Sequence, residues 1–134
     1  MPMTRVALRK GKADAYKRAI LAGLYQAMRD TVNVPEGDKF MSITEHDADG
    51  FDFGHDYLGI DRTDDLVQVQ IFLASGRTVD QKKHLYSRIV ELLSKDPGVR
   101  PQDVCVSLVE QPPENWSFGN GQAQFVHDSE RAVR

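Results

Sequence analysis

Near the start of the chain, apolar residues recur first at every second position and then at about every fourth position. Residues 3–8 alternate between two sets of side chains, with Thr4, Val6 and Leu8 on one side, which predicts a short strand. From residue 12 to about residue 32 an apolar residue recurs every fourth position, which predicts a helix. Its stripe consists of Tyr16, Ile20, Leu24, Met28 and Val32. Small residues beside the stripe predict close packing of this helix on a sheet: Ala19, Gly23 and Ala27.

The next part of the chain predicts two more strands. A break at residues 33–38 contains proline and glycine and ends the helix, and residues 40–46 alternate again as a strand. Residues 47–65 are rich in Asp and Gly and predict a long ordered loop with room for one short strand. Residues 66–74 are apolar except for two glutamines, which predicts a central strand buried on both faces.

A second helix and a fourth strand complete the pattern. Thr78 and Gln81 have the spacing of a capping box, which predicts the start of a helix. The Asp-Pro-Gly run at residues 96–98 ends it. The apolar stripe between them is Leu85, Ile89, Leu92 and Leu93. Residues 104–109 predict the fourth strand.

The elements therefore follow the order strand–helix–strand, loop, strand–helix–strand. A ferredoxin-like fold has the same order, so the pattern alone leaves both topologies open. The connection between the second and third strands is far longer than a hairpin turn, which favours two independent right-handed βαβ units. A chain of 134 residues has the length of one domain. We expect this domain at residues 1–126 and a C-terminal tail at residues 127–134.

Composition excludes several classes of protein. Hydrophobic residues make up 40% and charged residues 28%, as in ordinary globular domains, so disorder is disfavoured. The net charge of -3 gives no general attraction to nucleic acid or to anionic membranes. No apolar run has the length of a signal peptide or a membrane span. We expect a soluble, cytoplasmic protein with neither nucleic acid nor membrane as a partner.

Neither the single cysteine nor the acidic loop predicts a special site. Cys105 excludes an internal disulfide, and its apolar neighbours predict a small core residue. Asp47, Gly50 and Leu58 do not fit the spacing of an EF-hand, so the loop that contains them is interpreted as solvated and acidic. We therefore expect no bound metal.

The residue after the initiator methionine can carry chemistry. Methionine is usually removed before a small residue, and its removal would leave Pro2 as the N-terminus. A free N-terminal proline is a secondary amine, and a neighbouring cation or burial would bring its pKa toward neutrality. Such an amine is a competent general base. The alternative is that Pro2 only permits the removal of Met1.

A second candidate residue, Arg77, follows Ser75 and Gly76 and precedes the capped helix. Arginine is the natural bidentate partner of a carboxylate, and the first amides of a helix also favour an anion. These features predict an anion site. The alternative is an ordinary exposed arginine at the end of a strand.

Together these residues resemble the tautomerase superfamily. The segments that carry the resemblance are Met1-Pro2 before a strand, Pro35-Glu36-Gly37-Asp38, and Ser75-Gly76-Arg77-Thr78 with Gln81-Lys82. Three further segments are similar to the malonate semialdehyde decarboxylase-like branch: Tyr57-Leu58-Gly59-Ile60, Asp64-Asp65-Leu66-Val67 and Glu114-Asn115-Trp116-Ser117-Phe118-Gly119. The resemblance extends from Pro2 to about Phe125.

The resemblance implies an α+β fold of tandem β-α-β units, with a four-stranded mixed sheet and two helices packed on one face. It also implies a homotrimer that acts on small 2-oxo or 3-oxo carboxylates and their enols without a cofactor. Pro2 would be the catalytic base and acid, Arg77 would bind the substrate carboxylate, and Asp38 would polarise a water or a carbonyl group. Three aromatic residues would form a wall that excludes water: Trp116, Phe118 and Phe125.

One position departs from the decarboxylases. The resemblance implies a second arginine in those decarboxylases, two residues before the position of Arg77. This chain has Ser75 there. The leading hypothesis is therefore keto–enol tautomerisation of a small 2-oxo acid. Decarboxylation of a 3-oxo acid of the malonate semialdehyde type in the same pocket is the second hypothesis. A non-catalytic, ferredoxin-like ligand-binding module is the third.

Overall fold

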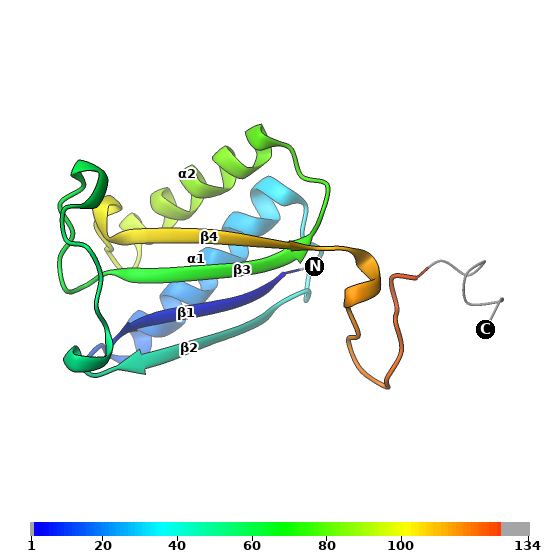
Figure 1. Ribbon diagram of the computed structural model, residues 1–134, viewed down its shortest axis with the longest axis horizontal. Helices are drawn as coiled ribbons and strands as arrows, with labels where there is room; N and C mark the ends of the chain where they lie inside the picture. The colour runs from blue at the N-terminus through cyan, green and yellow to red at the C-terminus, as the bar shows by residue number, and fades with distance from the viewer. Residues whose placement is uncertain (1, 127–134) are drawn as a thin grey trace.

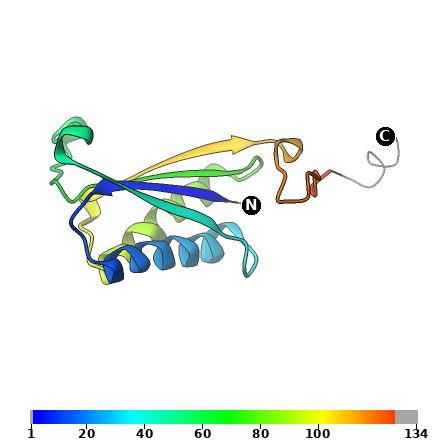
Figure 2. The same ribbon diagram turned by 90° about the horizontal axis from the view of Figure 1, so that it is seen from below.

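The computed structural model describes residues 2–126 and contains one four-stranded mixed sheet with two long helices. The strands are β1 (Met3–Arg9), β2 (Phe40–His46), β3 (Val67–Ala74) and β4 (Val104–Gln111), and the helices are α1 (Asp14–Val32) and α2 (Val79–Lys95) (Figure 1). Both helices lie on the same side of the sheet, as the rotated view in Figure 2 shows. The predicted α+β fold is confirmed. The predicted tail at residues 127–134 lies outside the described residues.

The strand order is β2-β1-β3-β4. Strand β1 is parallel to β2, β3 is parallel to β4, and β1 and β3 pair antiparallel in the centre of the sheet. Each parallel pair is joined by its own helix, so the chain forms two βαβ units. Because β2 and β3 are not neighbours, the ferredoxin-like arrangement left open by the sequence pattern is excluded.

Among the small residues of α1, Gly23 serves a different contact from the one predicted. A Cβ atom added at Gly23 would lie 2.8 Å from Cδ2 of Leu93, which belongs to α2 and is fully buried. Gly23 therefore permits the close approach of the two helices to each other, and not of α1 to the sheet. The predicted stripe does face the core, where Ile20 and Leu24 are fully buried.

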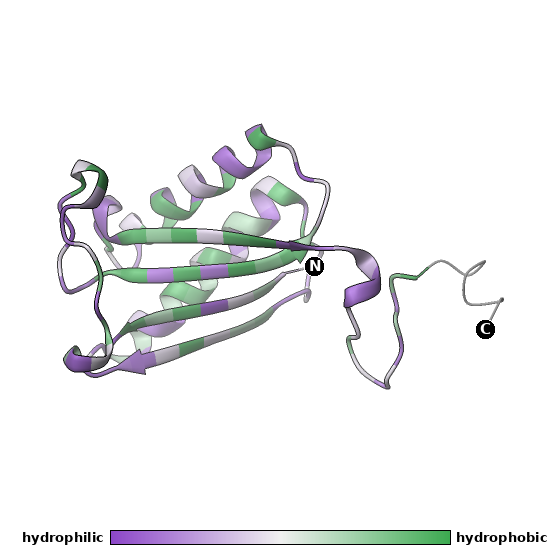
Figure 3. Cartoon of the chain, viewed as in Figure 1, coloured by the Kyte–Doolittle hydropathy of each residue, from purple (hydrophilic) through white to green (hydrophobic). Residues whose placement is uncertain are grey.

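The prediction that the third strand is buried on both faces is wrong. Val69 and Ile71 of β3 are buried, whereas Gln68 and Gln70 are exposed. In Figure 3, β3 accordingly carries purple bands among green ones. Cys105, the β4 partner of Gln68, is also exposed, so the prediction of a core cysteine is wrong for the same reason. Both helices cover one face of the sheet and leave the other face open in a single chain.

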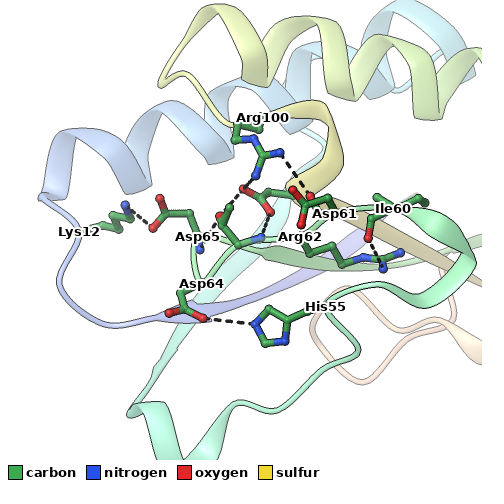
Figure 4. Close-up of polar contacts among 10 residues, drawn as sticks. Lys12, His55, Ile60, Asp61, Arg62, Asp64, Asp65 and Arg100 are labelled. Carbon is green, nitrogen blue, oxygen red and sulfur yellow. Dashed lines mark hydrogen bonds and ion pairs between the residues drawn. The ribbon is translucent and has the colours of Figure 1, made fainter.

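The long loop between β2 and β3 contains two short 3₁₀ turns, Ala48–Gly50 and Tyr57–Gly59, and no strand. Its own polar contacts hold it in place. The Arg62 guanidinium donates to the carbonyl oxygens of Gly54, Tyr57 and Ile60 at 3.1, 2.9 and 3.4 Å. Figure 4 shows this region together with the ion pair between Lys12 and Asp65, at 2.7 Å.

A buried carboxylate fastens the loop to the start of β4. Asp103 is 1% exposed, and its two oxygens accept hydrogen bonds from the backbone N–H of Thr63 at 2.7 Å and from the Thr63 hydroxyl at 2.6 Å. Both groups of Thr63 would lose a partner without this side chain.

In the described part of the chain, no helix combines the length and the apolar character that crossing a membrane requires.

We expect Asp103→Ala to lower the free energy of unfolding by about 2–3 kcal/mol, because it leaves a partly buried N–H and hydroxyl of Thr63 without an acceptor. Urea unfolding followed by circular dichroism would measure the change. Asp61→Ala, at an exposed position on the loop that contains Thr63, is the control and should alter stability by less than about 0.5 kcal/mol. Equal effects of the two substitutions would contradict the structural role of Asp103.

Candidate active site

Pro2 lies at the end of the sheet where β1 and β2 begin and where β3 and β4 end (Figure 1). It is buried and directly precedes Met3, which pairs with Phe40 of β2 and with Phe72 of β3. The connection from α1 to β2, the turn from β3 to α2 and the segment after β4 all reach this end of the sheet. We call it the proline end.

Asp38 belongs to the connection from α1 to β2 and lies two residues before β2 begins. The residue is 8% exposed, and neither carboxylate oxygen has a hydrogen-bond partner within residues 2–126. Burial raises the pKa of the Asp38 carboxyl above its usual value, and nearby positive charge, that of Arg77 included, offsets part of the rise. Asp38 therefore lies within the electrostatic reach of Arg77 and holds a proton more readily than an exposed aspartate.

Arg77 lies in the turn between β3 and α2 and is partly buried. Its Nη1 donates to the carbonyl oxygen of Ala74 at 2.9 Å, and its Nη2 donates to that of Val32 at 3.3 Å. Val32 is the last residue of α1, so the guanidinium meets the negative end of that helix dipole. A guanidinium has five N–H groups, so this anchored side chain can still bind a carboxylate.

The start of α2 confirms the predicted capping box. The Thr78 hydroxyl accepts from the backbone N–H of Gln81 at 3.1 Å, and the Gln81 side chain accepts from the backbone N–H of Thr78 at 3.0 Å. These bonds occupy two amides that could otherwise face an anion. Arg77, and not the helix terminus alone, is therefore the group at this turn best suited to bind an anion.

The aromatic residues predicted to form a wall do pack together. The rings of Trp116 and Phe118 stack with centroids 5.3 Å apart, and Phe125 meets Phe118 edge-on at 5.0 Å. Phe40, which the sequence analysis did not assign to the wall, lies 5.7 Å from Phe118. Because Phe40 is the first residue of β2, it joins the aromatic cluster to the proline end. Its position at the start of a predicted strand, two residues after Asp38, was the available signal.

The structure thus places Pro2, Asp38, Arg77 and the aromatic cluster at one end of the molecule, while their roles in catalysis stay predictions. Ser75, at the position of the missing second arginine, is exposed. Its backbone N–H donates to the carbonyl oxygen of Gln111 at 3.1 Å and so extends the pairing of β3 with β4. Within the described residues, no cluster of three His, Cys, Asp or Glu side chains suits a metal ion.

Comparison with known proteins identifies the family. A family model described as tautomerase enzyme matches residues 38–119. The chain belongs to the tautomerase family. It is 36% identical over 126 residues to the probable tautomerase YusQ of Bacillus subtilis (strain 168), a match that covers 94% of this chain and 99% of YusQ. It is 29% identical over 126 residues to the probable tautomerase YrdN of the same organism, covering 94% and 97% of the two chains.

Solved structures refine the assignment. The chain is 30% identical to a malonate semialdehyde decarboxylase described for its decarboxylase and hydratase activities, with a TM-score of 0.87 and coverage of 92% of this chain and 95% of that one. A native fused 4-OT, 24% identical with a TM-score of 0.75, shares the fold and covers 91% and 96%. This tautomerase is therefore an enzyme of the malonate semialdehyde decarboxylase-like branch, and its recognition from the sequence is confirmed.

We expect Asp38→Asn to stabilise the protein near neutral pH by less than about 1 kcal/mol. Because the folded state raises the pKa of Asp38, the native enzyme loses stability as the pH rises from the usual aspartate range through the raised pKa. The difference between variant and native enzyme should therefore be present at pH 7 and disappear near about pH 3.

Urea unfolding at the two pH values would measure this difference. Asp49→Asn, at an exposed position, is the control and should change stability by less than about 0.5 kcal/mol at either pH. A variant at position 38 that is less stable than the native enzyme at pH 7 would show that the carboxylate is stabilised by a partner.

Proposed function

We propose that this enzyme interconverts the enol and keto forms of a small 2-oxo acid, with Pro2 as the general base and acid. The proposal is supported chiefly by one observation: the buried Pro2, which follows Met1, shares one end of the sheet with an anchored arginine and with a buried carboxylate that has no hydrogen-bond partner among residues 2–126. It requires that Met1 be removed, because an amide nitrogen has no useful basicity.

In the proposed reaction the Arg77 guanidinium binds the carboxylate of the substrate and fixes its orientation. The Pro2 nitrogen takes the proton of the enol hydroxyl, which breaks the O–H bond. The same nitrogen then returns a proton to carbon as the C–H bond and the carbonyl form, so the reaction is balanced without a redox partner. One amine thus serves both as base and as acid.

Asp38 and the aromatic cluster would set the environment of this proton transfer. Asp38 would polarise the substrate carbonyl or a water, a role consistent with a carboxyl group whose oxygens have no partner within the described chain. Trp116, Phe118, Phe125 and Phe40 would exclude water from one side, and a lower local dielectric strengthens the attraction between Arg77 and a carboxylate.

A homotrimer is part of the same proposal. Fused 4-OT structures that share the fold are described as symmetric and asymmetric trimers. The sheet face opposite the helices is open in a single chain and exposes Arg5, Gln68 and Gln70. Such a face is available for contact with further copies.

Decarboxylation of a 3-oxo acid is the second candidate function. The likeness to malonate semialdehyde decarboxylase, at 30% identity and a TM-score of 0.87, favours it. Ser75 argues against decarboxylation as the main activity. The resemblance implies two arginines at this strand end in the decarboxylases, whereas this chain has only Arg77 at the two matching positions.

The first prediction tests Pro2. We expect the mass of the intact native protein to lack one methionine, and Pro2→Ala to lower kcat/KM for ketonisation of phenylenolpyruvate by roughly 10²–10⁴, the usual contribution of a positioned general base. Circular dichroism should show the same fold for both proteins. A retained Met1, or activity indifferent to Pro2, would contradict the mechanism.

The second prediction separates the two activities. We expect release of carbon dioxide from malonate semialdehyde to be slower than ketonisation of phenylenolpyruvate by the same sample. Ser75→Arg should raise the decarboxylation rate by roughly tenfold, because it adds a cation beside the developing charge. Ser75→Lys is the control for charge without a bidentate geometry. Comparable rates of the two reactions in the native enzyme would reverse the ranking of the activities.

A further inference from the structure

The turn that carries Arg77 is held from the neighbouring strand β4. The backbone N–H of Ser75 donates to the carbonyl oxygen of Gln111 at 3.1 Å. The next N–H, that of Gly76, donates to the Glu110 carboxylate at 3.3 Å. The last two residues of β4 therefore bind two successive amides of the turn, one through the backbone and one through a side chain.

The other oxygen of Glu110 binds α2. It accepts a hydrogen bond from the Lys82 ammonium, and the side chains of Glu110 and Lys82 are only 33% and 26% exposed. The hydrogen bond from Lys82, together with that from the Gly76 N–H, lowers the pKa of the Glu110 carboxyl, so the group is charged at neutral pH. An ion pair that is partly buried is screened less by salt than an exposed one.

We propose that Glu110 is a positioning residue that fixes the Arg77 guanidinium for binding the substrate carboxylate. Gly76 adopts a φ of +117°, a conformation that rarely suits other residues, so the turn has no regular strand or helix geometry of its own to hold it. Glu110 adds a restraint at Gly76 itself: it ties the amide before Arg77 to the first turn of α2. This inference rests on the proposed role of Arg77 as the carboxylate anchor.

The contacts of Arg77 show why its turn needs such a restraint. The guanidinium reaches two carbonyl oxygens, those of Ala74 and Val32, which belong to different elements. A shift of the turn by a fraction of an ångström would misdirect the remaining N–H groups, and bidentate binding of a carboxylate is sensitive to such shifts. Among the described contacts Glu110 makes no hydrogen bond or ion pair with the guanidinium; the two charges attract each other only at longer range, and the direct contact of Glu110 with the turn is the Gly76 N–H.

A single substitution of Glu110 would change the charge near the site as well as the hydrogen bond to Gly76. Removing Glu110 frees the Lys82 ammonium near the site, and an additional positive charge could itself attract a carboxylate. We therefore compare two double variants with the net charge of the native enzyme. Lys82→Met with Glu110→Gln keeps an oxygen that can accept from the Gly76 N–H, whereas Lys82→Met with Glu110→Ala removes it.

We expect the variant with alanine to raise KM for phenylenolpyruvate by roughly five- to tenfold, the loss of about one hydrogen bond to a charged partner, with kcat changed by less than about twofold. The variant with glutamine should restore most of the native KM. Lys95→Met with Glu91→Ala makes the same pair of charge changes nearer the other end of α2, where it removes the ion pairs of Glu91 with Lys95 and with Arg88, and should leave KM unchanged.

The same substitutions in an Arg77→Ala background complete the test, since residues that act through each other show non-additive effects. There, alanine at position 110 should add no further increase in KM. If Arg77→Ala itself leaves KM unchanged, the proposed carboxylate anchor is wrong. If Arg77→Ala raises KM but alanine at position 110 either has no effect alone or adds its full effect in that background, the positioning role of Glu110 is overturned and the anchor stands.

Discussion

The antiparallel pairing of β1 with β3 is the constraint on which the site depends. Each βαβ unit could form with its own parallel strand pair, and this central pairing fixes the register in which the two strand pairs meet, while α1 and α2 pack against each other beside it. It sets Met3 opposite Phe72, so the beginning of the first unit lies beside the end of the third strand. As a result Pro2, which precedes β1, and Arg77, which follows β3, reach the same end of the sheet although they are far apart in the sequence.

Two buried aspartates show how differently the ends of the sheet are built. Asp103 is 1% exposed and both of its oxygens accept hydrogen bonds from Thr63, so its burial stabilises the long loop. Asp38 is nearly as buried, yet its oxygens have no partner within residues 2–126. An unpaired buried carboxylate costs stability. Its presence at the proline end is consistent with a site that gives up some stability to keep a reactive group ready for a ligand.

The sequence predicted local structure better than it predicted which surfaces would be covered. Periodicity placed β2 at its observed residues, and the spacing of Thr78 and Gln81 identified the cap of α2, because both depend on nearby residues. The sequence pattern did not predict the exposure of Gln68 or the contact of Gly23, because distant elements set the surroundings of both residues. The helices cover only one face of the sheet, which leaves Gln68 exposed, and the Leu93 side chain that meets Gly23 comes from the other helix. Asp38 and the aromatic wall were found through family resemblance, since no local pattern marks a residue that becomes buried by the packing of remote segments.

The single arginine also bears on which reaction the site favours. Loss of carbon dioxide moves negative charge from the carboxylate onto the carbonyl oxygen, so a cation that holds the carboxylate also stabilises the ground state and opposes the step. A second cation at the carbonyl would correct this, and the chain has Ser75 where the family resemblance expects a second arginine. Keto–enol conversion keeps the carboxylate throughout, and Arg77 can bind it equally in the enol, the transition state and the ketone. In its proposed role as the carboxylate anchor, one arginine held by the carbonyl oxygens of Ala74 and Val32 is therefore better matched to tautomerisation than to decarboxylation.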